Sequence, residues 1–75
     1  NDTERSFLLE CCEFDPESCV QSSTLYTEYR NWTKDNGFIP RNINQVGKEW
    51  ERLGLEKRTK DGRRFWYGIR LKLEI

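Results

Sequence analysis

The sequence contains no histidine and no methionine among its 75 residues. Without histidine, the chain cannot form a Ser-His or Cys-His pair for nucleophilic catalysis. Its three cysteines include no Cys-x-x-Cys pair, and they are too few to supply the four ligands of a closed zinc site. We therefore expect no catalytic residue, no metal and no cofactor in this chain. The lack of methionine indicates that the natural start is missing, so we expect a piece of a longer protein.

Long hydrophobic runs are also missing. No stretch approaches the roughly 18 apolar residues of a membrane span, and the polar start 1–5 is unlike a signal peptide. The cysteines (Cys11, Cys12 and Cys19) are odd in number and two are adjacent, which argues against a disulfide framework. Size and composition predict a single domain, 1–75, of an intracellular, cytoplasmic protein under reducing conditions.

The chain has no net charge, because 13 basic side chains balance 13 acidic ones, but the charges are unevenly distributed. Residues 1–37 hold eight acidic and three basic residues, whereas residues 38–75 hold ten basic and five acidic residues. Such asymmetry is typical of a protein with one side that faces a polyanion. Two ordinary solvated faces would produce the same counts, so charge alone does not decide between these interpretations.

Apolar residues at helical spacing predict three helices. The first extends from Asp2 or Thr3 to about Phe14, where Asp15-Pro16 ends it. Its buried face is formed by Phe7, Leu8, Cys11 and Phe14, and its solvated face by Glu4, Glu10 and Glu13. Residues 19–21 then form either a short strand or a connector.

The second helix spans about 24–35, with Ser22 or Ser23 as its N-cap and Asn36-Gly37 at its end. Its apolar stripe consists of Leu25, Tyr26, Tyr29 and Trp32. The third helix spans about 41–53, begins at Arg41 or Asn42, and ends at Gly54. Its apolar stripe consists of Ile43, Val46, Trp50 and Leu53, and its polar stripe of Arg41, Gln45, Lys48 and Arg52. We interpret Gly47 as a position where the second helix approaches closely.

A β-hairpin follows, because Asp61-Gly62 lies between two strand-like runs, 55–59 and 63–71. Alternation in the second run predicts one buried face, formed by Phe65, Tyr67, Ile69, Leu71, Leu73 and Ile75. Trp66 falls on the opposite, basic face, and Gly68 predicts a bulge or a close backbone neighbour. The predicted fold class is α+β: a winged helix-turn-helix of three helices and a C-terminal hairpin wing, with an optional short third strand.

Motifs between residues 24 and 71 resemble those of a known protein family. They include Tyr26-x-x-Tyr29-x-x-Trp32, Val46-Gly47-Lys48-Glu49, Leu53-Gly54, Lys57-Arg58-Thr59 and Gly62-Arg63-Arg64-x-Trp66-Tyr67-Gly68. In this spacing the sequence is similar to the C-terminal winged-helix domain of phage and plasmid primase–helicases, which are related to the poxvirus primase–helicase. Trp50 and Val46 depart from the family pattern, where leucine and an aromatic residue are usual.

This resemblance implies a DNA-binding domain from the C-terminus of a replication protein of a mobile element. In that family the domain follows a superfamily-three ATPase, which would assemble the whole protein into a hexamer. The domain would help to place the helicase at an origin or fork. The chain itself has no phosphate-binding loop, so we expect an accessory binding domain and not an enzyme.

The candidate DNA contacts fall into two groups. Residues near the start of a recognition helix usually reach base edges, which makes Arg41, Asn44, Gln45 and Lys48 candidate base readers, with Arg52 on phosphate. The wing adds the candidate phosphate contacts Lys57, Arg58, Lys60, Arg63 and Arg64. Trp66 either stacks on a base or packs over Lys and Arg side chains.

We expect duplex or forked DNA as the partner, and no membrane. An alternative hypothesis is a protein-interaction module that docks a replication partner or a neighbouring helicase subunit, because fold does not fix function. The acidic N-terminal half favours this alternative.

Overall fold

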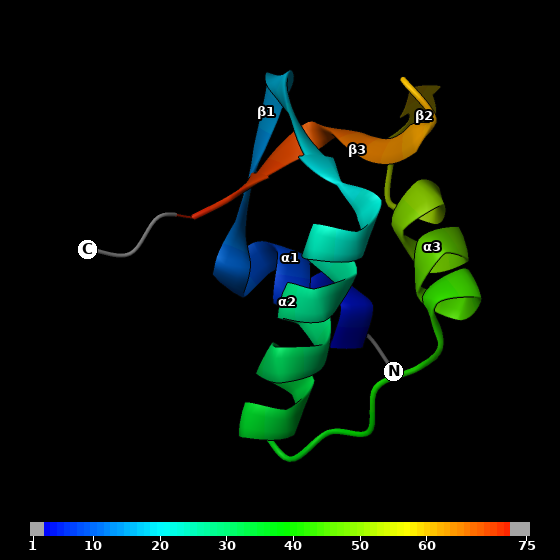
Figure 1. Ribbon diagram of the computed structural model, residues 1–75. Coiled ribbons are helices and arrows are strands. Elements are labelled where there is room, and N and C mark those ends of the chain that lie inside the picture. The colour runs from blue at the N-terminus through cyan, green and yellow to red at the C-terminus, as the bar shows by residue number, and fades with distance from the viewer. Residues whose placement is uncertain (1–2, 73–75) are drawn as a thin grey trace.

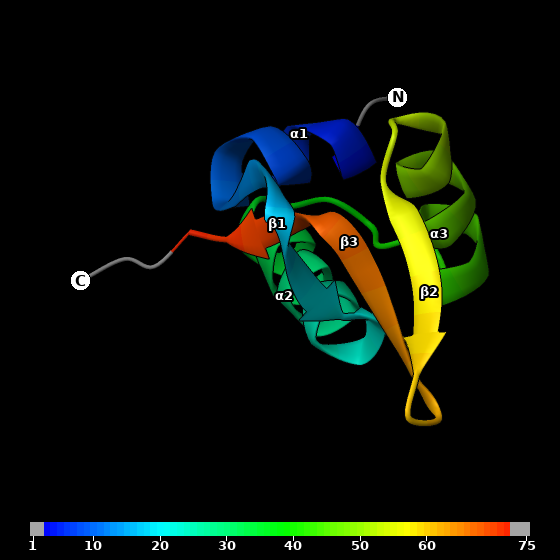
Figure 2. The same cartoon turned by 90° about the horizontal axis from the view of Figure 1, so that it is seen from above.

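The computed structural model describes residues 3–72, which form three helices and three strands. The elements are α1 (Thr3–Cys11), β1 (Cys12–Gln21), α2 (Ser22–Asp35), α3 (Ile43–Arg52), β2 (Glu56–Lys60) and β3 (Arg63–Leu71). The strands form one antiparallel sheet in the order β1-β3-β2. Figures 1 and 2 show the helices on one side of this sheet, while the turn between β2 and β3 projects past α3. This is the predicted α+β winged-helix arrangement, and it includes the third strand.

An aromatic core joins the helices to the sheet. Phe7 of α1 packs edge-on against Tyr29 of α2, and Trp50 of α3 packs edge-on against Trp66 of β3, both with ring centroids 5.7 Å apart. Edge-to-face contacts of this kind add to the stabilisation from buried area. Buried residues that were predicted for the core are Phe7, Leu8, Leu25, Tyr29, Val46, Trp50 and Ile69, and Tyr26, Trp32, Leu53 and Leu71 pack against them.

The first helix is shorter than predicted. α1 ends at Cys11, and Asp15-Pro16 lies inside β1, where it does not mark a helix end. Because the chain leaves the helix before Phe14, that side chain no longer shares a face with Phe7. Phe14 is 57% exposed, so its predicted burial is wrong.

A bend within β1 explains how the strand accommodates proline. Phe14 pairs with Ile69 and Cys19 pairs with Tyr67, so residues 15–18 leave the ladder. In this bend the Asp15 carboxylate accepts hydrogen bonds from the Glu17 N–H at 3.0 Å and the Ser18 hydroxyl at 2.9 Å. These two hydrogen bonds, with a smaller contribution from nearby Arg70, lower the pKa of Asp15 below its usual value.

Glu4 is buried, although it was predicted to lie in water. Only 1% of its surface is exposed, and its carboxylate accepts a hydrogen bond from the Tyr29 hydroxyl at 3.0 Å. The Arg41 guanidinium lies 3.5 Å from the same carboxylate, and Trp50 Nε1 donates to the Glu4 carbonyl at 3.4 Å. A buried carboxylate needs such partners because its desolvation is costly. Through these contacts Glu4 links α1 to α2, to α3 and to the α2–α3 connection. Burial also raises the pKa of the Tyr29 hydroxyl to about 12.

The buried face of β3 changes at Gly68. Gly68 has a φ of 90°, and the pairing of β1 with β3 breaks between Tyr67 and Ile69, which confirms the predicted bulge. An irregularity of this kind shifts the strand alternation by one residue. Trp66 is therefore only 1% exposed, and its predicted place on an exposed basic face is wrong. Leu73 and Ile75, which were also predicted for the buried face, lie outside the described residues.

Candidate nucleic-acid interface

The wing formed by β2 and β3 lies where the sequence predicts it. Its turn, Asp61-Gly62, has φ values of 53° and 76°, and positive values at both central positions are what a type I′ turn requires. β2 is an edge strand and is exposed along its whole length. Lys60 lies directly opposite Arg63, where two like charges destabilise a strand pair. The wing therefore holds its cations close together in water.

α3 begins later than the predicted helix. The Asn42 side chain accepts a hydrogen bond from the Gln45 N–H at 2.9 Å, and the Gln45 side chain accepts one from the Asn42 N–H at 3.4 Å. This capping box sets the start of the helix at Ile43 and occupies the Gln45 side chain. Ile43, predicted to be buried, is exposed. Further along the helix, Asn44 and Lys48 are exposed.

Arg41 lies outside α3, so its predicted place on the polar stripe of that helix is wrong. Its guanidinium is close to Glu4, and its carbonyl accepts a hydrogen bond from the Tyr26 hydroxyl at 2.7 Å. Its N–H donates to the Tyr29 hydroxyl at 3.3 Å. These contacts anchor the connection between α2 and α3 to the core.

Two other residues that were predicted to contact DNA form ion pairs with carboxylates of the chain. Arg52 lies 3.1 Å from Glu49 on α3, and Arg58 forms an ion pair with Glu56 on β2. Such exposed pairs contribute little to stability. In contrast, no carboxylate of residues 3–72 lies within 4 Å of Lys48, Lys57, Lys60, Arg63 or Arg64.

A groove separates α3 from the wing. One hollow of about 230 Å³ is lined by Gln21, Ser22, Ser23, Ile43, Asn44, Lys57 and Arg64. A second of about 310 Å³ is lined by Asn44, Gly47, Lys48, Glu51 and Lys57. Because the two hollows share Asn44 and Lys57, we treat them as one groove, which runs from the start of α2 across α3 to β2.

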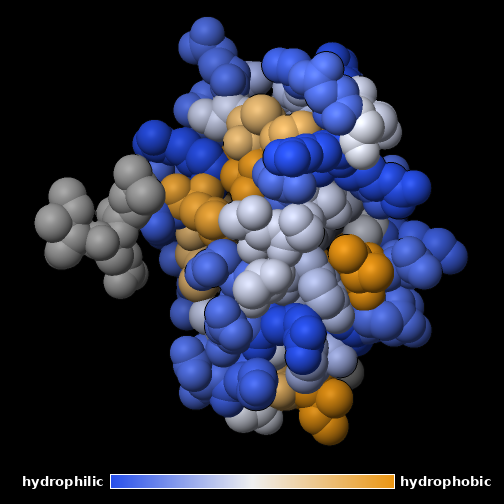
Figure 3. Space-filling view, in the orientation of Figure 1, coloured by the Kyte–Doolittle hydropathy of each residue, from blue (hydrophilic) through white to orange (hydrophobic). Residues whose placement is uncertain are grey.

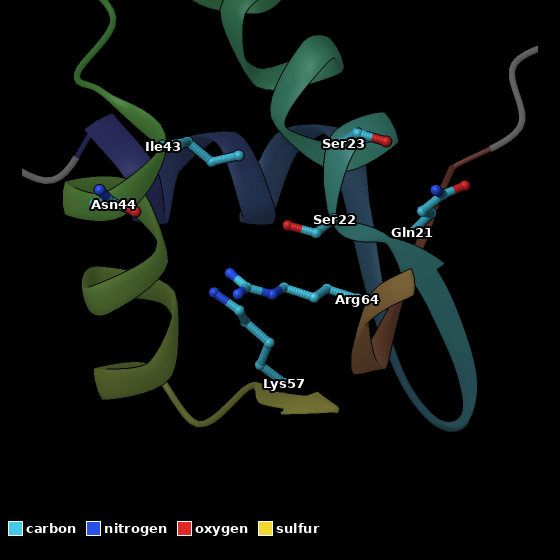
Figure 4. Close-up of a pocket in the computed structure, with 7 residues that line it drawn as sticks. All are labelled: Gln21, Ser22, Ser23, Ile43, Asn44, Lys57 and Arg64. Atoms are coloured by element: carbon cyan, nitrogen blue, oxygen red, sulfur yellow. The ribbon is translucent and has the colours of Figure 1, made fainter. Parts of the chain in front are cut away.

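The head groups of Lys57 and Arg64 lie beside each other in this groove, as Figure 4 shows. The surface around the wing and α3, at the upper right of Figure 3, is mostly hydrophilic. Lys60 and Arg63 instead line a separate hollow at the tip of the wing, together with Cys19. The structure thus places Lys57 beside Arg64 in one hollow and with Lys48 in the adjoining hollow, and it leaves the tip cations apart from them.

Trp66 packs against Lys57, one of the residues that line the groove. The Lys57 ammonium lies 5.3 Å from the centre of the Trp66 ring, a cation–π contact. Of the two predicted roles for Trp66, packing against a Lys side chain is confirmed, whereas its burial leaves no free face for a base. A Cβ at Gly47 would lie 3.6 Å from Trp66, so the close neighbour of Gly47 is β3 and not α2 as predicted.

Three groove residues at the start of α2 were not predicted as contacts. Ser22 and Ser23 were interpreted as N-caps, but the N-cap is Gln21, and it makes no side-chain cap hydrogen bond. The only sequence signal that could have marked these residues as groove contacts is the pair of serines where a strand passes into a helix. The signal is weak because serine is also the usual N-cap residue.

Within residues 3–72 no group of three or more His, Cys, Asp or Glu side chains could hold a metal ion. None of the helices in the same part of the chain has the length and apolar character needed to cross a membrane. The sequence matches no model of a known protein family, and comparison with curated proteins gives no match. The function must therefore be inferred from the groove and its charges.

Proposed function

We propose that this chain is a DNA-binding winged-helix domain that contacts DNA with α3 and the wing. The observation that carries this proposal is that Lys57 shares one hollow of the groove with Arg64 and the adjoining hollow with Lys48. No carboxylate of residues 3–72 lies within 4 Å of any of these three cations. Adjacent cations repel one another in water, and phosphates relieve that repulsion. Asn44 lies in the same groove, and an Asn side chain can form a bidentate contact with adenine.

The similarity of the motifs to phage and plasmid primase–helicases supports a more specific proposal. In it, the domain is an accessory part of a replicative primase–helicase and helps to place it at an origin or fork. An ATPase outside this chain would form the hexamer and perform catalysis. The partner would be duplex or forked DNA in a reducing, intracellular compartment, and the exposed thiol of Cys19 is compatible with such a compartment.

The salt dependence of duplex binding tests the DNA proposal. Binding of a labelled random duplex is measured by fluorescence anisotropy at several salt concentrations. If about four to six phosphates are contacted, log affinity falls against log salt with a slope of about −4 to −5. Replacing Arg63 and Arg64 with alanine should weaken binding to all duplexes similarly and reduce the slope by about 2.

The matched control replaces Arg30 and Lys34, two exposed cations of α2 outside the groove. The control variant should keep the slope of the unmodified protein. Unchanged affinity of the Arg63/Arg64 variant would show that the wing is not part of the DNA interface. Asn44→Ala should instead change sequence preference, by about 1–3 kcal/mol for a lost bidentate contact.

An apolar patch on another part of the surface favours a second candidate function, protein–protein interaction. Leu9 and Phe14 are each 57% exposed, and they line a hollow of about 240 Å³ together with Arg5, Leu8 and Leu53. Exposed apolar groups around a hollow are typical of contact surfaces. Absence of any duplex binding at about 50 μM protein and low salt, where non-specific DNA binding is normally measurable, would favour this function.

A further inference from the structure

The end of the groove at the start of α2 has the features of an anion site. The N-cap Gln21 makes no side-chain cap hydrogen bond, so within residues 3–72 the N–H groups of the first turn have no side-chain acceptor. A helix N-terminus with free N–H groups attracts negative charge. Lys57 and Arg64 direct their head groups into the same hollow (Figure 4). Its volume of about 230 Å³ is several times the roughly 30 Å³ of a water molecule in the liquid.

Ser22 is an independent indication of a ligand in this hollow. Only 8% of the surface of Ser22 is exposed, and no hydrogen bond within residues 3–72 involves its hydroxyl, whose oxygen stays accessible from the hollow. A hydroxyl can donate one hydrogen bond and accept others, so it suits an anionic ligand. Figure 4 shows this hydroxyl directed into the hollow above Arg64, whereas the hydroxyl of the next residue, Ser23, points away from it. Ser22 therefore offers a hydrogen bond to a group that occupies the hollow.

We propose that the hollow is a seat for one phosphate group of a nucleic acid. The Ser22 hydroxyl, the Lys57 ammonium, the Arg64 guanidinium and the first N–H groups of α2 would surround it. Donors from three different elements suit a tetrahedral group with several acceptor oxygens, and the guanidinium can bind two of those oxygens at once. This proposal rests on the proposed DNA-binding function and specifies where one phosphate of the nucleic acid binds. A phosphate seated here places Asn44, on the wall of the same hollow, next to the bound strand.

One NMR experiment and one binding experiment test the phosphate seat. First, ¹⁵N–¹H spectra of the full chain are recorded with increasing inorganic phosphate and, at matched ionic strength, with chloride. We expect saturable shifts of the amides of Ser22, Ser23 and Thr24 with phosphate only. Second, duplex affinity is measured for Ser22→Ala and for the control Ser6→Ala, a serine on α1 outside the groove. Loss of one hydrogen bond to a charged group should weaken binding by Ser22→Ala about tenfold, while Ser6→Ala binds as the unmodified protein does.

Duplexes with a 5′-phosphate and with a 5′-hydroxyl distinguish the source of the phosphate. If both bind equally, the seat holds an internal backbone phosphate. If only the phosphorylated duplex loses affinity through Ser22→Ala, the seat holds a terminal phosphate. Arg64→Gln, at an exposed position, provides the same comparison should Ser22→Ala fail to fold.

The remaining outcomes separate this proposal from the DNA-binding function. Duplex binding that is unaffected by Ser22→Ala and Arg64→Gln, without phosphate shifts at α2, would overturn the seat and leave DNA binding in place. Saturable phosphate binding without any duplex binding would overturn the DNA proposal and keep the anion site. Shifts that never saturate and extend equally to Arg30 and Lys34 would indicate general ion binding and overturn the seat.

Discussion

Replacement of Gly47 by alanine should stabilise the protein, although glycine in the middle of α3 suggests a need for space. The structure gives the reason. A Cβ at this position would lie 3.6 Å from Cζ2 of Trp66 and 3.9 Å from Nζ of Lys57, both ordinary van der Waals distances. Gly47 is buried, so the added methyl group would fill space between α3 and the wing without displacing either neighbour.

The expected magnitude follows from two contributions. Alanine is favoured over glycine inside a helix by about 0.8–1.0 kcal/mol. A buried methyl group adds at most about 0.8 kcal/mol, reduced here because it also shields the Lys57 ammonium from water. We therefore expect the free energy of unfolding to rise by about 1 kcal/mol. For a domain of this size that corresponds to an increase in Tm of about 4–8 °C.

Thermal and urea unfolding, followed by circular dichroism, measure this change. The matched control is Gly54→Ala, which also adds one methyl group but at a φ of 104°. Apart from its chain neighbours, no part of residues 3–72 lies within 4 Å of the added Cβ. Left-handed backbone disfavours alanine, so this variant should lose about 1–2 kcal/mol. A Gly47→Ala protein less stable than the original would refute the reasoning. It would mean that Trp66 and Lys57 lie closer to α3, and the groove between α3 and the wing would be narrower than described.

Two further predictions concern the contacts that position α3. Asn42→Ala removes the side-chain cap of α3 and should lower the free energy of unfolding by about 1 kcal/mol, as measured in urea, whereas an unchanged midpoint would contradict the capping box. Tyr29→Phe should cost about 1–3 kcal/mol at neutral pH because Glu4 loses a hydrogen-bond donor. The folded-state pKa of Tyr29 is raised from 10.0 to about 12, so its contribution is complete below pH 10 and is lost as the pH rises through 12. The stability difference between the two proteins should therefore shrink over that interval in parallel urea titrations, and a constant difference would contradict the assignment.

Local signals in the sequence determined most of the secondary structure. Helical spacing identified the buried side chains Leu25 and Tyr29 of α2 and Val46 and Trp50 of α3. Asp61-Gly62 located the turn of the wing, because periodicity and backbone φ depend on a residue and its near neighbours. The same signals failed at the end of α1. There the apolar spacing continued to Phe14, but pairing with β3, which is far away in the sequence, drew residues 12–14 into a strand.

The candidate site was predictable only in part for the same reason. Charge and spacing selected Lys48 and the cations of the wing as candidate DNA contacts, but they could not show which of these side chains have carboxylate partners. Ser22 and Arg64 meet in one hollow only because α2 packs beside β3.

Burial of polar and bulky groups was decided by tertiary structure alone. Glu4 is buried because its partners Tyr29 and Arg41 come from 25 and 37 residues further along the chain. Trp66 is buried because the bulge at Gly68 changes the alternation of β3 and turns the ring toward Trp50. The sequence by itself determined which residues could form helices, turns and a basic wing, since those properties are local. The tertiary structure decided which charges stay unpaired and where they meet, since those properties depend on contacts between distant segments.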